Sequence, residues 1–288
     1  MRLRSCAKVN LGLEVLRKRS DGYHDIRTLF QSIDLADGLE LEATADGRIR
    51  LEGDDASIPW DETNLVHRAA RLIREAAGTA AGAFIRVSKA VPPGKGLGGG
   101  SANAALTLLG LNRLWSAGLG PEALDGLALR LGSDVPYFLR GGLCLGESRG
   151  EALTPLTDLP RLPCVLAFPP YPILTAEVYA GLGPSLTSGD KDSKIMRFLE
   201  TGDFGLLENA LEEVILRRHP ELEGLKRFFR ERGAMASLVT GSGSAVFGLF
   251  SGPDAAREAL EGLRAMSEAR LAETLPRKDY WERVGAGA

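Results

Sequence analysis

Residues 92–105, PPGKGLGGGSANAA, place a glycine-rich loop directly before an expected helix. Five of the seven residues 94–100 are glycine, whereas alanine, the strongest helix former, dominates the residues after Ser101. The sequence therefore predicts a flexible loop and a helix that begins near Ser101. The first turn of such a helix has free backbone N–H groups and the positive end of the helix dipole, which together favour an anion such as a phosphate.

Two common nucleotide-binding motifs do not account for this loop. The P-loop motif needs Ser or Thr after its Gly-Lys pair, and Gly96 follows the pair here. The dinucleotide motif G-x-G-x-x-G is formally present as Gly94, Gly96 and Gly99. However, two prolines precede the loop, and a second helix rather than a parallel strand follows the first, so the context of a dinucleotide-binding unit is missing. A helix entry without a ligand needs fewer glycines, so we favour a phosphate site.

The composition is that of an ordinary globular protein. The 288 residues are 44% hydrophobic and 25% charged, and the formal net charge of -3 gives no reason to expect nucleic acid or a membrane as a partner. Cys6, Cys144 and Cys164 are far apart in the chain and fit buried thiols of a reducing compartment better than disulfides. No run approaches the roughly 18 apolar residues of a membrane span. We expect a cytoplasmic enzyme that is a monomer or a weak homodimer.

The sequence CAKVNLGLEVL at residues 6–16 predicts a strand with one apolar face. Apolar residues such as Val9 and Leu11 alternate there with polar or small ones, which is the period of a half-buried strand. Successive side chains of a strand point to opposite faces, so Lys8 and Asn10 project together from the other face.

The rest of the chain reads as two α+β lobes, residues 1–156 and 157–288, because the composition changes near residues 150–160. A turn is expected at Asp21-Gly22, and a polar tail after residue 266. Strands are predicted over 29–35, 38–44, 83–91 and 162–169, and as a pair joined by a glycine turn within 236–250. Helices are predicted from Thr63 or Asn64 to about Gly78, and over 101–115, 121–131, 193–200, 204–217, 221–232 and 254–266.

Five motifs together resemble the GHMP kinase superfamily. The frame P-x-x-x-G-L-G-G-G-S-A at 92–102 resembles its phosphate-binding loop, AKVNLGLEV at 7–15 its N-terminal motif, and VTGSGSAVFG at 239–248 its C-terminal glycine motif. DGYH at 21–24 and GSDVPYFL at 132–139 resemble the branch of this superfamily that acts on 4-diphosphocytidyl-2-C-methyl-D-erythritol. Because the motifs occur in order over almost the whole chain, the resemblance is specific.

The resemblance implies a two-lobed fold with the active site in the cleft between the lobes. The N-terminal lobe would be an S5-like α/β domain and the C-terminal lobe a ferredoxin-like α+β domain. ATP would be the phosphoryl donor, with Mg²⁺ as the accompanying ion. The residues that the resemblance places at ATP are Pro92, Pro93, Gly94, Lys95, Gly96, Leu97, Gly98, Gly99, Gly100, Ser101, Ala102 and Asn103.

Asp134 is the candidate for the catalytic carboxylate. It follows Gly132-Ser133 at the end of a predicted helix, and Pro136 prevents the helix from continuing. A kinase must remove a proton from an alcohol as the phosphoryl group arrives, and a positioned Asp can accept it. By itself, Gly-Ser-Asp is also typical of a turn. The resemblance places Lys8 beside this carboxylate, where an ammonium favours the ionised Asp and the developing alkoxide, whereas an isolated Lys is usually solvated.

The same resemblance implies the residues that contact the substrate. Asn10 would orient it by hydrogen bonds, Tyr23 would stack on the cytosine, and His24 would form hydrogen bonds with the base. The other implied substrate residues are Thr175, Tyr179, Gly241, Ser242 and Gly243. The two glycines of the last segment fit a hairpin turn equally well.

Two segments depart from the pattern of the family. The loop usually continues Gly-Gly-Gly-Ser-Ser-Asp-Ala, whereas this chain has Ala102 and Asn103 after Ser101. Any role of the missing hydroxyl and carboxylate in metal binding or helix capping falls to Ser101, Asn103 or water, and no metal ligand is assigned. ENALEE at 208–213 replaces the usual Asn-Asp-Leu/Phe-Glu. Neither departure involves the proposed base or lysine.

The expected reaction is phosphorylation by ATP of the 2-hydroxyl of 4-(cytidine 5'-diphospho)-2-C-methyl-D-erythritol, a step of non-mevalonate isoprenoid synthesis. The alternatives are another GHMP kinase, such as a homoserine or mevalonate kinase, an NAD-dependent oxidoreductase, and a nucleotide-binding regulator without catalysis. DGYH and GSDVPYF argue against the first, and no hydride-transfer residues are evident for the second. The third predicts that Asp134→Ala leaves the function intact.

Overall fold

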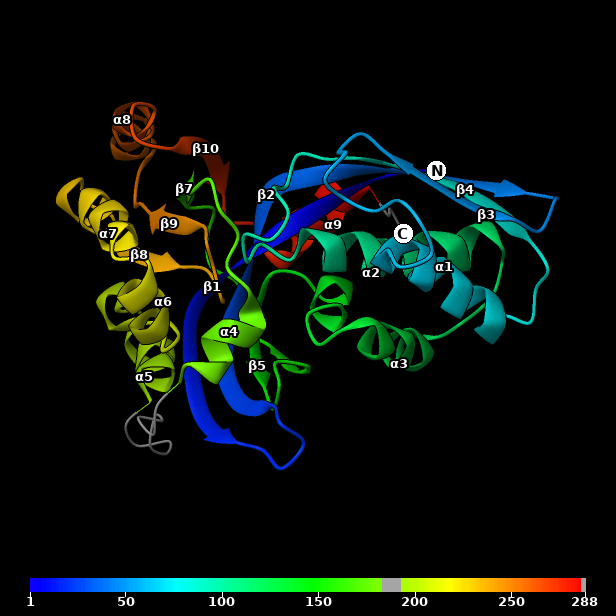
Figure 1. Cartoon of the computed structure of the whole chain (residues 1–288), viewed down its shortest axis with the longest axis horizontal. Coiled ribbons are helices and arrows are strands. Elements are labelled where there is room, and N and C mark those ends of the chain that lie inside the picture. Colours follow the sequence, from blue (N-terminus) through cyan, green and yellow to red (C-terminus); the bar gives the residue numbers. More distant parts are fainter. Residues whose placement is uncertain (183–192, 286–288) are drawn as a thin grey trace.

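A computed structural model describes residues 1–182 and 193–285 of the chain and arranges them as two lobes (Figure 1). Each lobe is a β-sheet with helices packed on it, which confirms the predicted α+β class. The strands are β1 (Arg2–Lys18), β2 (His24–Thr44), β3 (Ile49–Gly53), β4 (Gly82–Ser88), β5 (Leu143–Glu147), β6 (Ala152–Pro155), β7 (Pro163–Phe168), β8 (Ala236–Val239), β9 (Val246–Leu249) and β10 (Glu268–Glu273). The helices are α1 (Leu65–Ala76), α2 (Gly99–Leu114), α3 (Pro121–Leu131), α4 (Thr175–Ala180), α5 (Lys194–Thr201), α6 (Glu212–Arg218), α7 (Glu221–Glu231), α8 (Pro253–Leu263) and α9 (Arg277–Val284), with 3-10 turns η1 (Pro136–Leu139) and η3 (Phe204–Leu206).

The long antiparallel hairpin of β1 and β2 lies at the centre of the molecule. β2 pairs with β1 and also with β4 and β5, so that the N-terminal sheet has the order β3-β4-β2-β5-β6 with β1 beside β2. The predicted turn at Asp21-Gly22 is confirmed, because the Asp21 carboxylate accepts a hydrogen bond from the Tyr23 N–H at 3.1 Å and Gly22 has a φ of +87°. This hairpin therefore carries residues of β1 and of DGYH to one region of the molecule.

Helix α2 packs on β1 and β2, and helices α1 and α3 pack beside it (Figure 1). Helix α1 has the predicted N-cap, since Asn64 Oδ1 accepts a hydrogen bond from the Val66 N–H at 2.9 Å. Helix α2 begins at Gly99, two residues before the predicted Ser101. Its N-cap, Gly98, has a φ of +70°, and a Cβ there would lie 2.7 Å from the Phe138 ring. The close packing of the loop therefore needs glycine at this position.

The C-terminal sheet has the antiparallel order β10-β7-β9-β8. Helix α7 packs on β8 and β9, and helix α8 packs on β7 and β10. The predicted strand pair within 236–250 is confirmed as β8 and β9, and the turn between them carries residues 240–245. None of the helices among the described residues is long and apolar enough to cross a membrane.

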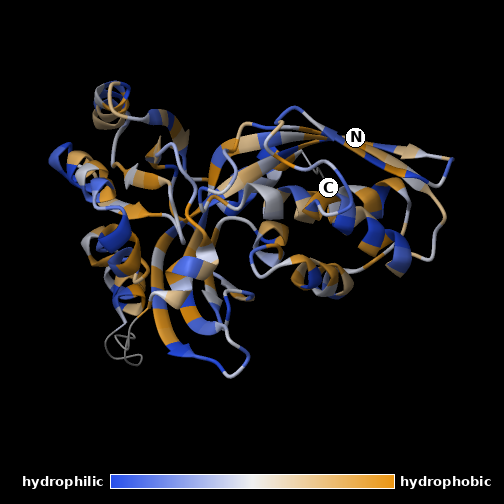
Figure 2. Ribbon diagram, in the orientation of Figure 1, coloured by the Kyte–Doolittle hydropathy of each residue, from blue (hydrophilic) through white to orange (hydrophobic). Residues whose placement is uncertain are grey.

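The apolar face of β1 joins the two lobes. Val9 and Leu11 are fully buried in one hydrophobic cluster with Leu166 of β7 and Phe247 of β9. Hydrophobic residues accordingly concentrate on these central strands, whereas the β1–β2 turn is hydrophilic (Figure 2). Residues 5–15 of β1 are all buried, so the prediction of a half-buried strand is wrong. Lys8 and Asn10 nevertheless lie on the face opposite the apolar one and line the cleft between the lobes.

The prediction of one helix over residues 204–217 is wrong. Asp203 caps the short 3-10 turn η3 by accepting a hydrogen bond from the Gly205 N–H at 2.9 Å, and helix α6 begins only at Glu212. Between them, the Leu13 N–H donates to the Glu208 carbonyl and the Ala210 N–H donates to the Leu13 carbonyl, at 2.9 and 2.8 Å. Pairing with β1 thus overrides the helical pattern of this segment.

The prediction of a polar tail after residue 266 is also wrong. Strand β10 pairs with β7 at the edge of the C-terminal sheet, and helix α9 returns to pack on the N-terminal sheet. Tyr280 of α9 is fully buried, and its hydroxyl donates to the Phe138 carbonyl at 2.7 Å. Both elements are rich in charged residues and bury few side chains, so their amphipathic pattern is weak.

Candidate active site

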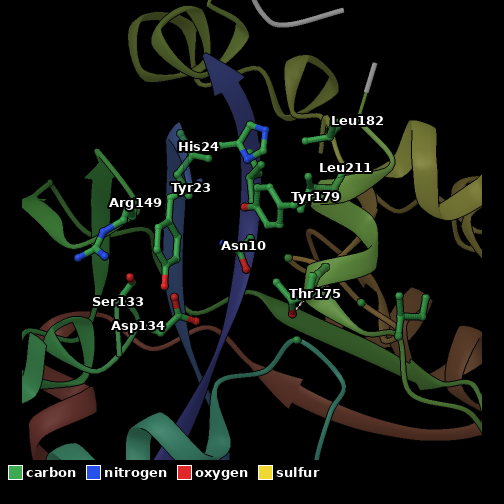
Figure 3. Close-up of a pocket in the computed structure, with 18 of the residues that line it drawn as sticks. Asn10, Tyr23, His24, Ser133, Asp134, Arg149, Thr175, Tyr179, Leu182 and Leu211 are labelled. Atoms are coloured by element: carbon green, nitrogen blue, oxygen red, sulfur yellow. Dashed lines mark hydrogen bonds between the residues drawn. The ribbon is translucent and has the colours of Figure 1, made fainter. Parts of the chain in front are cut away.

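A cavity of about 970 Å³ lies in the cleft between the lobes. Strand β1, the β1–β2 turn, the segment after α3, helix α4 and the turn after β8 all contribute to its wall (Figure 3). Of the predicted residues, it brings together Lys8, Asn10, Tyr23, His24, Gly94, Gly96, Gly98, Asp134, Thr175, Tyr179, Gly241, Ser242 and Gly243. The proposed catalytic and substrate residues therefore share one cavity, although they come from distant parts of the sequence.

The Lys8–Asp134 pair lies at one end of this cavity. Lys8 Nζ is 3.4 Å from Asp134 Oδ2, and it donates a hydrogen bond to Asn10 Oδ1 at 2.6 Å. The Lys8 side chain is only 4% exposed, whereas that of Asp134 is 38% exposed. A buried ammonium thus faces a carboxylate that a substrate can reach, and the alternative of a solvated lysine is excluded.

Asn10 is fixed by hydrogen bonds on three sides. Its Nδ2 donates to Thr28 Oγ1 at 2.8 Å, and the Thr28 hydroxyl donates to the Gly12 carbonyl. Its backbone N–H donates to Thr240 Oγ1 at 3.0 Å, which links β1 to the turn after β8. These bonds orient Asn10 Oδ1 toward Lys8, so Asn10 positions the ammonium, whereas its contact with a substrate stays a prediction.

Asp134 stands where two short elements meet. Helix α3 ends at Leu131, and the 3-10 turn η1 begins at Pro136, as the sequence predicts for the end of the helix. The carboxylate points into the cavity beside Ser133 and below the Tyr23 ring (Figure 3). Because no hydrogen bond within the described residues covers it, apart from its contact with Lys8, the carboxylate is free to accept a proton.

Aromatic residues form the other end of the cavity. The His24 and Tyr179 rings are in contact, with centroids 5.2 Å apart and an angle of 33° between their planes. Burial and the positive charge of Lys18 lower the pKa of His24 below its usual 6.5. Burial, and to a lesser extent the charge of Asp134, raises the pKa of the Tyr179 hydroxyl well above 10. Both groups are therefore neutral near pH 7 and can act as hydrogen-bond partners.

Arg149 is a cavity residue that the sequence analysis missed. Its guanidinium lies over the Tyr23 ring, 5.0 Å from the centroid, in a cation–π contact. Glu151 holds it in place by accepting hydrogen bonds from the Arg149 N–H at 2.8 Å and from Nε at 3.2 Å. The only signal in the sequence was an Arg before Gly150, in a segment that reads as an ordinary turn.

Thr175 and Ser242 connect helix α4 to the turn after β8. Their hydroxyl oxygens are 2.7 Å apart, as the dashed line in Figure 3 marks. Gly241 and Gly243 of this turn line the cavity with their backbones. A supporting role of the turn is consistent with this arrangement, and direct contact with a substrate stays a prediction.

A second cavity of about 360 Å³ adjoins the first at the glycine loop. Gly94, Gly96 and Gly98 line both cavities, and residues 92–101 and 103 line the second. The N-terminus of α2 has no side-chain cap, so its backbone N–H groups are available to an anion. The loop also contacts the reactive end, because the Lys8 N–H donates to the Leu97 carbonyl at 3.0 Å. A phosphate at this helix terminus would therefore be close to Lys8.

Two of the twelve residues predicted at ATP, Lys95 and Ala102, do not present a functional group to this cavity, and a third, Asn103, presents only part of its amide. The Lys95 ammonium donates to the carbonyls of Pro169 and Tyr171, and its pKa is lowered by burial. Ala102 is fully buried in the core and does not line the cavity. Asn103 Nδ2 donates to Asp37 Oδ2 at 3.0 Å, so that this amide group helps to hold α2 against β2. The role of these residues in binding ATP stays a prediction.

The comparisons with known proteins agree with this geometry. The family described as GHMP kinases N terminal domain matches residues 64–142, and GHMP kinases C terminal matches residues 195–269. A relative from Pelotomaculum thermopropionicum named 4-diphosphocytidyl-2-C-methyl-D-erythritol kinase is 45% identical over 91% of this chain and 93% of its own length. A relative of the same name from Alkaliphilus metalliredigens is 38% identical over 98% of this chain and 99% of its own.

Solved structures show the same relationship. A crystal structure of 4-(cytidine 5'-diphospho)-2C-methyl-D-erythritol kinase matches with a TM-score of 0.83 and 40% identity, over 95% of this chain and 99% of that chain. A homoserine kinase from Cytophaga hutchinsonii matches with a TM-score of 0.72 over 96% of each chain, and at 18% identity it shows the shared fold alone. The two lobes and the glycine loop between them are those of a GHMP kinase. Within that class, the chain belongs to the 4-diphosphocytidyl-2-C-methyl-D-erythritol kinase family.

Proposed function

We propose that this chain transfers the γ-phosphoryl group of ATP to the 2-hydroxyl of 4-(cytidine 5'-diphospho)-2-C-methyl-D-erythritol, giving ADP and the 2-phosphate, in isoprenoid precursor synthesis. The names of the relatives describe a kinase of this substrate. The observation that carries the proposal is the Lys8–Asp134 contact of 3.4 Å beside the glycine loop that both cavities share. An acceptor in the larger cavity and a donor in the smaller one would meet at this pair.

Each group at the reactive end has a defined task in this reaction. Asp134 accepts the proton of the 2-hydroxyl as the oxygen attacks the γ-phosphorus and the bond to the ADP oxygen breaks. Lys8 stabilises the negative charge that develops on the attacking oxygen as its proton leaves. The backbone N–H groups of the glycine loop and the N-terminus of α2 hold the phosphates in place.

The residues at the smaller cavity fit a Mg²⁺ ion that binds together with ATP. Mg²⁺ prefers oxygen ligands and often binds through substrate phosphates and one or two protein groups, which agrees with the absence, among the described residues, of a cluster of three His, Cys, Asp or Glu side chains. Asn103 Oδ1 is buried without a hydrogen-bond partner, and Ser101 lines the same cavity. These two oxygens would complete the shell of the ion, which when bound neutralises charge on the phosphates.

The aromatic end of the larger cavity would select the cytidine diphosphate group. Tyr23 and Tyr179 offer faces for stacking on the base, and the neutral His24 offers one donor and one acceptor. Arg149 adds a positive charge at the same wall, where a diphosphate between base and alcohol would pass. This arrangement supports a nucleotide-linked acceptor over a small free alcohol.

The direct test is the acceptor dependence of ADP release, with the phosphorylated position identified by ³¹P NMR. We expect ADP release to require the cytidine-linked substrate, and homoserine and mevalonate to give no more than the background without acceptor. Equal turnover of mevalonate or homoserine would show a different GHMP kinase, and nicotinamide-dependent chemistry without ADP release would overturn the kinase assignment.

The same preparation also tests the expected monomer or weak homodimer by sedimentation, and fractionation of the source cells tests the expected cytoplasmic location.

A further inference from the structure

Two buried polar side chains before and within α6, Asn209 and Glu212, hold the turn after β8 without lining either cavity. Asn209 is 3% exposed, and its Nδ2 donates to the carbonyls of Val239 and Gly241 at 2.8 and 2.7 Å. Its Oδ1 accepts a hydrogen bond from the Leu211 N–H at 3.0 Å. Both donor hydrogens and the acceptor of this amide are therefore occupied within the protein.

Glu212 binds the same strand, through the backbone N–H of Val239. Its carboxylate accepts a hydrogen bond from the Val239 N–H at 2.6 Å and another from Lys226 Nζ at 2.5 Å. The residue is 8% exposed, and burial raises the pKa of its carboxyl group above the usual value. Val239, the last residue of β8, thus has its N–H bound by Glu212 and its carbonyl bound by Asn209.

The segment that carries these side chains is also bound to the catalytic strand. The Leu13 N–H donates to the Glu208 carbonyl, and the Ala210 N–H donates to the Leu13 carbonyl, so residues 208–210 pair with β1 three residues beyond Asn10. Asn209 therefore bridges two elements, β1 and the turn after β8. Together with the hydrogen bond from Asn10 to Thr240, it holds the two elements against each other.

The turn that they hold lies directly on the reactive end. Thr240 Oγ1 accepts the hydrogen bond from the Asn10 N–H at 3.0 Å. A Cβ on Gly241 would lie 3.0 Å from Asn10 Oδ1 and 3.6 Å from Lys8 Nζ, and a Cβ on Gly96 would lie 2.2 Å from the Thr240 carbonyl oxygen. There is no spare space at this junction, so a displaced turn would displace Asn10 and Lys8 or the glycine loop.

We propose that Asn209 and Glu212 are positioning residues of the kinase, which set the place of Lys8 through the turn after β8. The inference rests on the proposed function only in that phosphoryl transfer is its readout. Loss of their hydrogen bonds to the turn is expected to lower kcat by roughly 10²-fold, as for a misplacement of about 1 Å of reacting groups. The KM values for ATP and the acceptor are expected to change by no more than about threefold, because neither side chain lines the larger or the smaller cavity.

The first test compares Asn209→Ala with Leu222→Ala, measured well below both unfolding temperatures. Leu222 of α7 is fully buried in the C-terminal lobe and forms no hydrogen bond with the turn, so its truncation destabilises the lobe and leaves the hydrogen bonds of the turn in place. Asn209→Ala is expected to lose kcat as stated, whereas Leu222→Ala keeps the wild-type kcat. Equal kcat values for the two variants would overturn the proposal.

A second pair keeps the test decisive if Asn209→Ala fails to fold. It consists of two double variants, in which Lys226→Met is combined with either Glu212→Gln or Glu212→Met. Both double variants remove the buried charge pair, and they differ only in whether an acceptor for the Val239 N–H remains. The Gln variant is expected to keep kcat within about threefold of wild type, and the Met variant to lose at least about tenfold. Equal kcat values in this pair would overturn the role of Glu212, and an inactive wild-type protein would overturn the proposed function instead.

Discussion

The two ends of the larger cavity are built in different ways. At the reactive end, Lys8 and Asn10 are almost completely buried, and a chain of hydrogen bonds through Thr28 and Thr240 fixes them. At the aromatic end, Tyr23 is 56% exposed, and its ring lies against the Arg149 guanidinium in a cation–π contact. Rate enhancement by preorganised charges requires fixed positions, whereas recognition of a flexible nucleotide allows adjustment. We therefore expect changes at the reactive end to lower kcat and changes at the aromatic end to raise KM.

Lys8→Met should give the largest effect, because it removes the ammonium and keeps a side chain of similar length. We expect kcat to fall by at least about 10²-fold with little change in either KM, as for loss of a preorganised electrostatic group. Lys18→Met is the matched control, since Lys18 lines the same cavity at its exposed, aromatic end. Equal kcat values for the two variants in steady-state kinetics would contradict the division of tasks between the two ends of the cavity.

Tyr23→Ala should act on binding. Stacking of an aromatic ring on a base contributes about 1–3 kcal/mol, so the KM of the cytidine-linked substrate is expected to rise by about tenfold or more. The kcat at saturating substrate and the KM of ATP should stay close to wild type. Tyr23→Phe keeps the ring and serves as the control. A fall in kcat with an unchanged KM would place Tyr23 at the reactive end and contradict the division.

Arg149→Met should raise the same KM by a smaller factor, about fivefold, because a charge-assisted bond to a diphosphate is partly replaced by water at this half-exposed wall. Arg149→Lys keeps the positive charge, so its KM should lie between those of Arg149→Met and wild type. Added salt should reduce the difference between the Met variant and wild type. A difference that grows with salt would argue against an electrostatic role.

His24 gives the smallest effect, which depends on pH. Burial and the Lys18 charge lower its pKa below 6.5, so the ring is neutral at pH 7 and becomes charged only as the pH falls below that value. Protonation replaces its acceptor with a second donor, so the KM of the cytidine-linked substrate is expected to rise at acidic pH. Lys18→Met should move this rise to higher pH. In His24→Asn, the KM should not rise at acidic pH. A rise that persists in that variant would assign the titration to another group.

The sequence was informative where a pattern is local. The glycine loop before α2, the alternation of β1 and the turn at Asp21-Gly22 each predict their structure because the backbone conformation depends on neighbouring residues. Together with the family resemblance, these patterns predicted the residues that meet at Lys8 and Asp134. The local argument failed where distant contacts decide the conformation.

Four features show such contacts. Residues 208–210 leave the helical pattern because they pair with β1, and helix α9 is held by Tyr280, which packs on the other lobe. Lys95 lies in the glycine loop, yet its ammonium binds carbonyl groups of the C-terminal lobe. Asn209 and Glu212 were noted only as a departure from a motif, and their hydrogen bonds to Val239 are visible only in three dimensions.

The central claim is that Asp134 takes the proton of the acceptor hydroxyl in a site where Lys8 is already in place. The most direct measurement is the single-turnover rate of ADP formation by Asp134→Asn with both substrates bound, beside the acceptor Kd of the same variant. We predict a rate at least about 10²-fold below wild type, as for loss of a general base, with a Kd within about threefold. A single-turnover rate equal to that of wild type would contradict this account of the active site.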